Sequence, residues 1–277
     1  METAYAGVTL GAINWPHGLI LIDSPFRADD ARAWRSSLIN MGGGVERMLI
    51  NLDAHVDRTL GVRAMECTIL AQDKVAGVFH NRPLTFKSQT IEIGADWELV
   101  GNLGSVRWAP PELTFTDHLK IYWDEKPMRV EYHPGPATGA SWVILPEHKV
   151  DFVGDCVVVN QPPFLATADL KLWIGQLELL LSDEYREYLV VGGRGGLASY
   201  RDIHTQLLFL RKVQERVEKL AAQNAPVDQL LPLGAALLAD FDAPEGRETQ
   251  FRQRLMWGLR QYYLRHYHPN SPDIIEE

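Results

Sequence analysis

The chain of 277 residues contains little cysteine and no apolar run long enough to cross a bilayer. A membrane-spanning helix needs about 20 consecutive apolar residues, so we expect no membrane partner. Only Cys67 and Cys156 are present, both in apolar segments, which is typical of buried free thiols and not of a disulfide framework. The N-terminal segment lacks the charged and apolar regions of a signal peptide, and we therefore expect a cytoplasmic protein.

Positive charge is also scarce. The 27 Lys and Arg residues are outnumbered by 36 Asp and Glu residues, which gives a formal net charge of -9. Binding to a phosphate backbone needs a clustered basic surface, but the densest basic segment, 247–265, is interleaved with glutamate, glutamine and aromatic residues. We therefore expect no nucleic-acid partner. The apolar content of 46% is sufficient for one large hydrophobic core.

Several ionisable residues stand together directly after the apolar run 48–52. The segment 53–58, DAHVDR in one-letter code, presents Asp53, His55, Asp57 and Arg58 in the loop that follows a predicted strand. Carboxylate and imidazole groups are common metal ligands. The segment resembles the HxHxDH signature of the metallo-β-lactamase superfamily, with Asp53 at the position of the first His and Arg58 at the position of the last.

Four further segments resemble landmarks of the same superfamily in the same order along the chain. The sequence LIDSP in 18–25 matches the end of its first long strand, and 149–155 matches the strand that carries its bridging aspartate, here Asp155. The segment 188–196 resembles the strand and loop that normally end in GHG, with Arg194 in place of the His. The segment 134–141 resembles the GHT-type loop but contains no His. Four landmarks in order favour the fold far more strongly than one motif.

The resemblance implies an α+β fold, a four-layer αβ/βα sandwich over residues 1–224, with a C-terminal helical extension over 225–277 packed on the same domain. Period-two apolar patterns predict strands, and helical patterns predict helices. The predicted strands are 7–12, 19–22, 47–50, 66–71, 89–93, 98–100, 114–115, 119–123, 129–132, 142–145, 150–153 and 188–191. The predicted helices are 28–41, 59–64, 168–181, 200–223 and 247–267.

The resemblance also implies two adjacent metal sites, of which the first keeps Asp53, His55 and Asp155 as ligands and lacks its third His. Two carboxylates and one imidazole suit a single zinc, iron or manganese ion with an open coordination position. The short side chain of Asp53 and a neighbouring arginine favour the opposite interpretation, in which no metal cofactor is bound.

The second site would keep Asp57 and Asp155 and would gain Arg58 and Arg194. A guanidinium is always protonated and has no lone pair for a cation, so neither arginine can be a ligand. We expect both arginines to form salt bridges with the two aspartates and to supply the positive charge of the missing ion. The alternative is that Arg58 and Arg194 form a binding site for a small anionic ligand.

Two functions from different classes follow from these residues. The first is a non-catalytic or ligand-binding protein, a pseudoenzyme with a degenerate metal site. The second is a hydrolase of esters, thioesters or lactams with a mononuclear metal site, in which His55 and Asp57 are the candidate catalytic residues. A fold does not decide between them, so enzymatic activity stays open. The predicted helix 247–267 carries aromatic residues along one side, which either pack on the same domain, form a homodimer interface or cover the mouth of the site as a lid.

Overall fold

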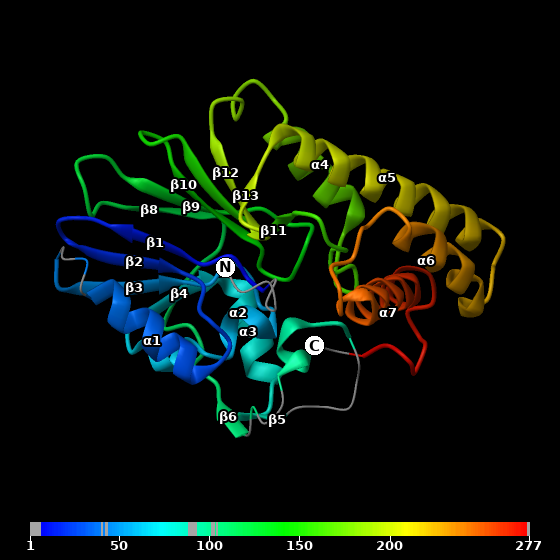
Figure 1. Ribbon diagram of the computed structural model, residues 1–277, viewed down its shortest axis with the longest axis horizontal. Helices are drawn as coiled ribbons and strands as arrows, with labels where there is room; N and C mark the ends of the chain where they lie inside the picture. The colour runs from blue at the N-terminus through cyan, green and yellow to red at the C-terminus, as the bar shows by residue number, and fades with distance from the viewer. Residues whose placement is uncertain are drawn as a thin grey trace.

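The computed structural model describes residues 7–39, 41, 44–87, 93–100, 103 and 105–275. Its β-strands form two large sheets and one short ribbon (Figure 1). The first sheet has the order β1 (Gly11–Asn14), β2 (Gly18–Ile22), β3 (Glu46–Ile50), β4 (Thr68–Gln72) and β7 (Leu113–Phe115). Strands β2, β3, β4 and β7 are parallel, and β1 is antiparallel to β2.

The second sheet has six strands, of which β11 and β12 pair in parallel and all other neighbours pair antiparallel. Their order is β13 (Leu197–Ala198), β12 (Leu189–Arg194), β11 (Val150–Val158), β10 (Ser141–Leu145), β9 (Met128–Tyr132) and β8 (His118–Ile121). The ribbon pairs β5 (Thr85–Lys87) with β6 (Ser105–Arg107).

Strand β2 is buried on both faces because its apolar residues alternate between two cores. Ile20 and Ile22 pack toward strands of the second sheet, in a cluster that also contains Val130 of β9. Leu19 and Leu21 join a separate cluster with helix α1 (Ala28–Ile39). Successive side chains of a strand point to opposite faces, so a continuous apolar strand is suited to a position between a second sheet and a helix.

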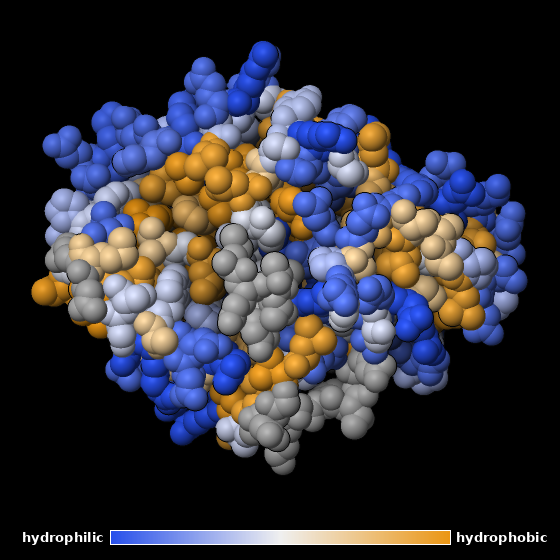
Figure 2. Space-filling model, in the orientation of Figure 1, coloured by the Kyte–Doolittle hydropathy of each residue, from blue (hydrophilic) through white to orange (hydrophobic). Residues whose placement is uncertain are grey.

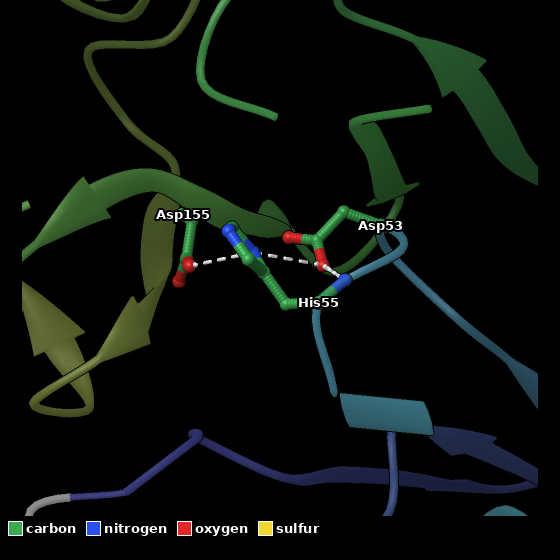
Figure 3. A group of neighbouring side chains, drawn as sticks. All are labelled: Asp53, His55 and Asp155. Carbon is green, nitrogen blue, oxygen red and sulfur yellow. Dashed lines mark hydrogen bonds and ion pairs between the residues drawn. The ribbon is translucent and has the colours of Figure 1, made fainter. Parts of the chain in front are cut away.

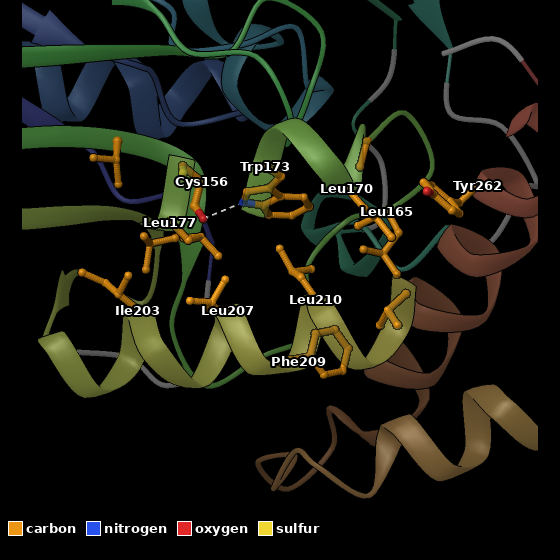
Figure 4. Packing of buried hydrophobic residues seen from close by; sticks show 14 of the residues in the cluster. Cys156, Leu165, Leu170, Trp173, Leu177, Ile203, Leu207, Phe209, Leu210 and Tyr262 are labelled. Carbon is orange, nitrogen blue, oxygen red and sulfur yellow. Dashed lines mark hydrogen bonds between the residues drawn. The ribbon is translucent and has the colours of Figure 1, made fainter. Parts of the chain in front are cut away.

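The largest core cluster lies between the second sheet and the helices α4 (Leu170–Leu180) and α5 (Tyr200–Ala222) (Figure 4). Trp173 of α4 is 1% exposed, and its indole Nε1 donates a hydrogen bond to the carbonyl of Cys156 at 2.8 Å. Ile203 and Leu207 of α5 pack in the same cluster. Both cysteines are free, and Cys156 is buried there as its position in an apolar segment predicted.

The C-terminal helices α6 (Leu230–Leu238) and α7 (Glu248–Tyr267) pack against α5 and share its core cluster. The apolar side of α7 is 0 to 6% exposed at Phe251, Leu255, Leu259, Tyr262 and Tyr263. The aromatic stripe therefore packs on the chain's own core. No helix of the described segments has the length and apolarity needed to span a membrane.

One predicted strand was wrong. Residues 98–100 do not form a strand, because η2 (Asp96–Leu99) is a 3₁₀ helix. The Glu98 carboxylate accepts hydrogen bonds from the backbone N–H of Ile93 at 2.9 Å and Gly94 at 2.8 Å, which stabilises a turn. The predicted helix 59–64 is divided between α2 (Val56–Thr59) and a 3₁₀ turn, η1 (Val62–Met65). The predicted strand 89–93 lies outside the described residues except at its last position.

The short strands β5, β6 and β13 had no predicted counterpart, and neither had three further elements. These are α3 (Asp73–Asn81), η3 (Val227–Gln229) and α6. Helix α3 begins at a cap in which the Gln72 side chain accepts a hydrogen bond from the backbone N–H of Lys74 at 2.6 Å. A glutamine cap is not among the usual signals for a helix start, which are Ser, Thr, Asp and Asn.

Candidate functional site

The site lies where strands of the two sheets end at a common edge. Asp23 follows β2, Asp53 and His55 follow β3, Asp155 lies in β11, and Arg194 ends β12. The carboxyl ends of parallel strands meet at one edge of a sheet, so the polar residues after them converge. Asp23 makes its turn with a left-handed backbone (φ 59°), which aspartate tolerates better than most residues.

The three predicted metal ligands are close together (Figure 3). Donor atoms of Asp53, His55 and Asp155 all lie within 4.8 Å of one another, and the three residues are 1 to 8% exposed. The His55 Nδ1 lies 3.1 Å from Asp53 Oδ1 and 3.3 Å from Asp155 Oδ2. The imidazole also contacts Phe164, with ring centroids 5.1 Å apart. The imidazole is thus held between two carboxylates.

Arg58 is buried completely and contacts three carboxylates. Its Nε lies 3.0 Å from Asp53 Oδ2, its Nη1 pairs with Asp23, and its Nη2 pairs with Asp155. Two of these aspartates are the carboxylate members of the predicted metal group. The guanidinium therefore shares both carboxylates that would hold an ion.

Arg194 is also completely buried and takes a different set of partners. Its Nη2 lies 3.0 Å from Asp57 Oδ2 and its Nε lies 3.4 Å from Asp155 Oδ2. Asp57 additionally accepts a hydrogen bond from the backbone N–H of Trp97 at 3.1 Å. Arg58 and Arg194 thus meet at Asp155, as the motif positions predicted, and Asp57 pairs with Arg194.

Asp96 of η2 is a further member that the sequence did not reveal. Its carboxylate pairs with Arg194 and accepts hydrogen bonds from Arg247 Nη1 at 3.1 Å and Gln250 Nε2 at 2.9 Å. Arg254 Nη2 lies 3.5 Å from it. The three partners at 247, 250 and 254 are spaced by three and four positions, which places them on one side of a helix. The polar stripe at these three positions on a predicted amphipathic helix was the signal from which a buried polar partner could have been expected.

These residues together form what we call the charge cluster. It comprises five aspartates, four arginines and one histidine: Asp23, Asp53, Asp57, Asp96, Asp155, Arg58, Arg194, Arg247, Arg254 and His55. All are buried. Burial of unpaired charges is very costly, so the near balance of five carboxylates and four guanidiniums is what makes this arrangement tolerable.

A glycine gives Arg194 its access to the site. A Cβ atom on Gly193 would clash with the carbonyl carbon of Gly154 and with Asp155 Oδ1. No side chain fits in that space, so only glycine allows β12 to approach the Asp155 carboxylate so closely. The GGRGG sequence in 192–196 therefore serves packing as well as loop formation.

Electrostatics separates the aspartates of the charge cluster into two kinds. For Asp155, burial alone would raise the pKa, but Arg58 and Arg194 lower it well below its usual range. For Asp23, burial outweighs Arg58 and raises the pKa to about 6, so this carboxyl is partly protonated just below neutral pH. Burial also raises the pKa of Asp57 despite Arg194, and lowers the pKa of Arg254 to about 10.

Comparison with known proteins supports the fold that the motifs predicted. Neither a family model nor a curated protein matches the chain. A metallo-beta-lactamase from Pontibacter korlensis is 17% identical, with a TM-score of 0.57 over 72% of this chain and 85% of that one. A metallo-beta-lactamase family protein from Thermus thermophilus is 18% identical, with a TM-score of 0.61 over 95% and 89%.

A sec-alkyl sulfatase is 14% identical, with a TM-score of 0.61 over 99% of this chain, which spans 50% of that structure. At such identities the likeness concerns the fold, and chemistry has to be argued from the site. Both large sheets, the helices on them and the converging strand ends agree with it. The chain has the metallo-β-lactamase fold.

Proposed function

We propose that this protein is a non-catalytic member of its fold, in which arginines take the place of the metal ions and the charge cluster is a structural centre. One observation carries the proposal: the guanidinium of Arg58 is completely buried and pairs with Asp53 and Asp155. These are the two carboxylates available to an ion in the predicted ligand group. The cation that they need is already part of the chain.

The oxygen atoms of the site support this proposal. Asp53 Oδ1 accepts a hydrogen bond from the backbone N–H of His55 at 2.9 Å, and its Oδ2 pairs with Arg58. Asp155 Oδ1 pairs with Arg58, and its Oδ2 lies 3.4 Å from the Nε of Arg194. Every oxygen of both carboxylates therefore has a protein donor. A divalent ion would have to displace these donors while being repelled by two guanidiniums.

The residues at the position of the family's second metal site are less suited to hold an ion than those at the first. Its carboxylates, Asp57 and Asp155, both pair with Arg194, and Arg58 stands where the signature has its last His. Neither arginine has a lone pair to give. A hydrolytic metal site also needs an open coordination position for water, whereas Arg58 and Arg194 are 0% exposed.

The alternative function is a hydrolase of esters, thioesters or lactams with one zinc, iron or manganese ion. Its support is the close group of Asp53, His55 and Asp155. In such an enzyme Arg58 would have to leave both carboxylates, and Asp57 and His55 would be the residues available for proton transfer. The cost of removing a buried guanidinium from its partners makes this the weaker candidate.

The predicted partners stay predictions. A small anionic ligand at Arg58 and Arg194 would require the charge cluster to open, because both guanidiniums already face carboxylates. A homodimer through α7 would use the outer side of that helix, since its apolar side packs inside the chain.

Metal analysis tests the proposal directly. Wild-type protein, purified without added metal, should contain no stoichiometric zinc, iron or manganese by elemental analysis. The double variant Arg58→His, Arg194→His should take up more zinc than wild type in calorimetric titration, because it loses two fixed charges and gains two imidazoles. A control with two added surface histidines, Arg211→His and Arg186→His, should not, since both arginines are exposed. Stoichiometric metal in the wild type would refute the proposal and favour the hydrolase.

A further inference from the structure

A cavity of about 700 Å³ lies beside α5, between that helix, the segment 158–163 after β11 and the loop 240–244 after α6. A volume of this size is within the range of small-molecule sites. The cavity is separated from the charge cluster by Gln161, which lines it and accepts a hydrogen bond from Arg254 Nη1 at 2.7 Å. It contains none of the predicted metal ligands.

One side of the cavity is apolar. Phe209 of α5 and Phe241 pack edge to face there, with ring centroids 5.0 Å apart. Leu208, which is 51% exposed, extends the apolar surface along α5. In Figure 2 hydrophobic residues gather on the surface over α6, and hydrophilic residues cover the neighbouring outer part of α5. An exposed apolar wall beside a cavity is a surface that a ligand with an apolar body would cover.

The charged residues of the same cavity are predominantly acidic. Asp202, Asp240 and Asp242 line it, together with a single lysine, Lys212. The ammonium of Lys212 lies 2.7 Å from Asp240 Oδ2, so this pair neutralises itself. Asp202 also caps α5, where its Oδ2 accepts hydrogen bonds from the Ser199 backbone N–H at 2.8 Å and the Ser199 hydroxyl at 2.6 Å, so Asp242 carries the negative charge most accessible to a ligand. The cavity is therefore electrostatically complementary to a cation and repels an anion.

We propose that this cavity binds an organic cation, an ammonium compound with an apolar body. The apolar body would pack against Leu208 and Phe241, and the ammonium would lie toward Asp242, with Asp202 adding its charge to the same side of the cavity. Aromatic faces attract cations as well as apolar groups, so the partly buried Phe241, which packs on the buried ring of Phe209, favours both parts of such a ligand. The proposal goes beyond the role of the charge cluster, because it concerns other residues and does not depend on whether a metal is bound.

Three probes share a phenyl ring and differ in charge: 2-phenylethylamine, 2-phenylethanol and phenylacetate. Their affinities therefore separate the contribution of charge from that of apolar contact. Calorimetric titration of the full chain at neutral pH should show saturable 1:1 binding of the amine. The alcohol should bind more weakly by about fivefold or more, the factor expected from loss of a partly exposed charge pair. Phenylacetate should bind most weakly. Equal affinity for amine and alcohol, or no saturable binding of the amine, would overturn the proposal.

Variants locate the binding. Asp242→Asn should weaken amine binding by about fivefold and leave 2-phenylethanol unchanged. Asp228→Asn removes the same charge from an exposed position outside the cavity and should leave both unchanged. Thr205→Arg, on the exposed part of α5 that lines the cavity, would place a tethered cation there and should abolish amine binding. An equal loss in Asp242→Asn and Asp228→Asn would mean that net charge attracts the amine, and would refute the site.

Discussion

Removal of the Arg58 side chain is the sharpest test of the charge cluster. Arg58→Ala deletes a guanidinium that is 0% exposed and pairs with Asp23, Asp53 and Asp155. Breaking a buried ion pair costs about 3 to 5 kcal/mol, because the partner is left charged and without compensation. A small domain is stable by about 5 to 15 kcal/mol, so this single change would remove a large part of the total.

The number of partners does not multiply this cost by three. Asp53 keeps its contact with His55 at 3.1 Å, and Asp155 keeps His55 and Arg194. Asp23 keeps the backbone N–H of Leu52 at 3.0 Å and a long contact of 3.5 Å with an asparagine amide. The loss therefore corresponds to about one broken pair, centred on Asp23. The pKa of Asp23 is about 6 beside Arg58 and rises further without it, so this carboxyl can protonate, and we expect a cost at the lower end of the range, about 3 kcal/mol.

Urea unfolding followed by circular dichroism measures the effect. The control Arg211→Ala breaks an ion pair with Glu178 whose side chains are half exposed, and should cost about 0 to 1 kcal/mol. Asp23→Asn added to Arg58→Ala should recover stability, because it removes the carboxylate left without a cation. A cost below about 1 kcal/mol for Arg58→Ala, or a further loss in the double variant, would refute the reasoning.

Three further outcomes follow from the structure. A chelator should leave the wild-type melting temperature unchanged, and a fall that zinc, iron or manganese reverses would show a metal that stabilises the native state. Asp96→Asn should speed hydrogen exchange of α7 amides relative to wild type, because Asp96 holds Arg247 and Gln250 of that region; unchanged exchange would contradict this. Asp151 is 0% exposed, its carboxylate has no hydrogen-bond partner among the described residues, and burial raises its pKa well above the usual range. Its contribution to stability is thus fully present below the unfolded-state pKa of about 4 and is lost as pH rises toward the raised folded-state pKa, so in urea unfolding Asp151→Asn should gain on wild type with rising pH, at a slope of at most about 1.4 kcal/mol per pH unit. A difference that stays constant with pH would count against the buried acid.

The sequence was sufficient for much of the fold. The order of four landmarks predicted the metallo-β-lactamase fold, and the likeness to solved structures confirmed it. Helix α5 was predicted to within one residue, because its signals are local: Ser199 and Asp202 form a capping box, and apolar residues recur at helical spacing. The arginines at 58 and 194 were also placed from the sequence at motif positions where the resembling family carries histidine, since the neighbouring motif residues set the register.

The partners of each charge were decided by tertiary structure. Asp57 and Arg58 are adjacent in the chain, but neighbours in a helix point in directions about 100° apart, so within α2 they face different partners. Asp96 lies in a turn that the sequence placed in a loop before a predicted strand. Two of its partners, Arg247 and Gln250, are more than 150 residues away at the start of α7. Contacts between such distant segments depend on how the C-terminal helices pack across the site, and local patterns in a sequence carry no information on that packing. The departures from the motif were therefore encoded locally, whereas the charge cluster exists only in the folded chain.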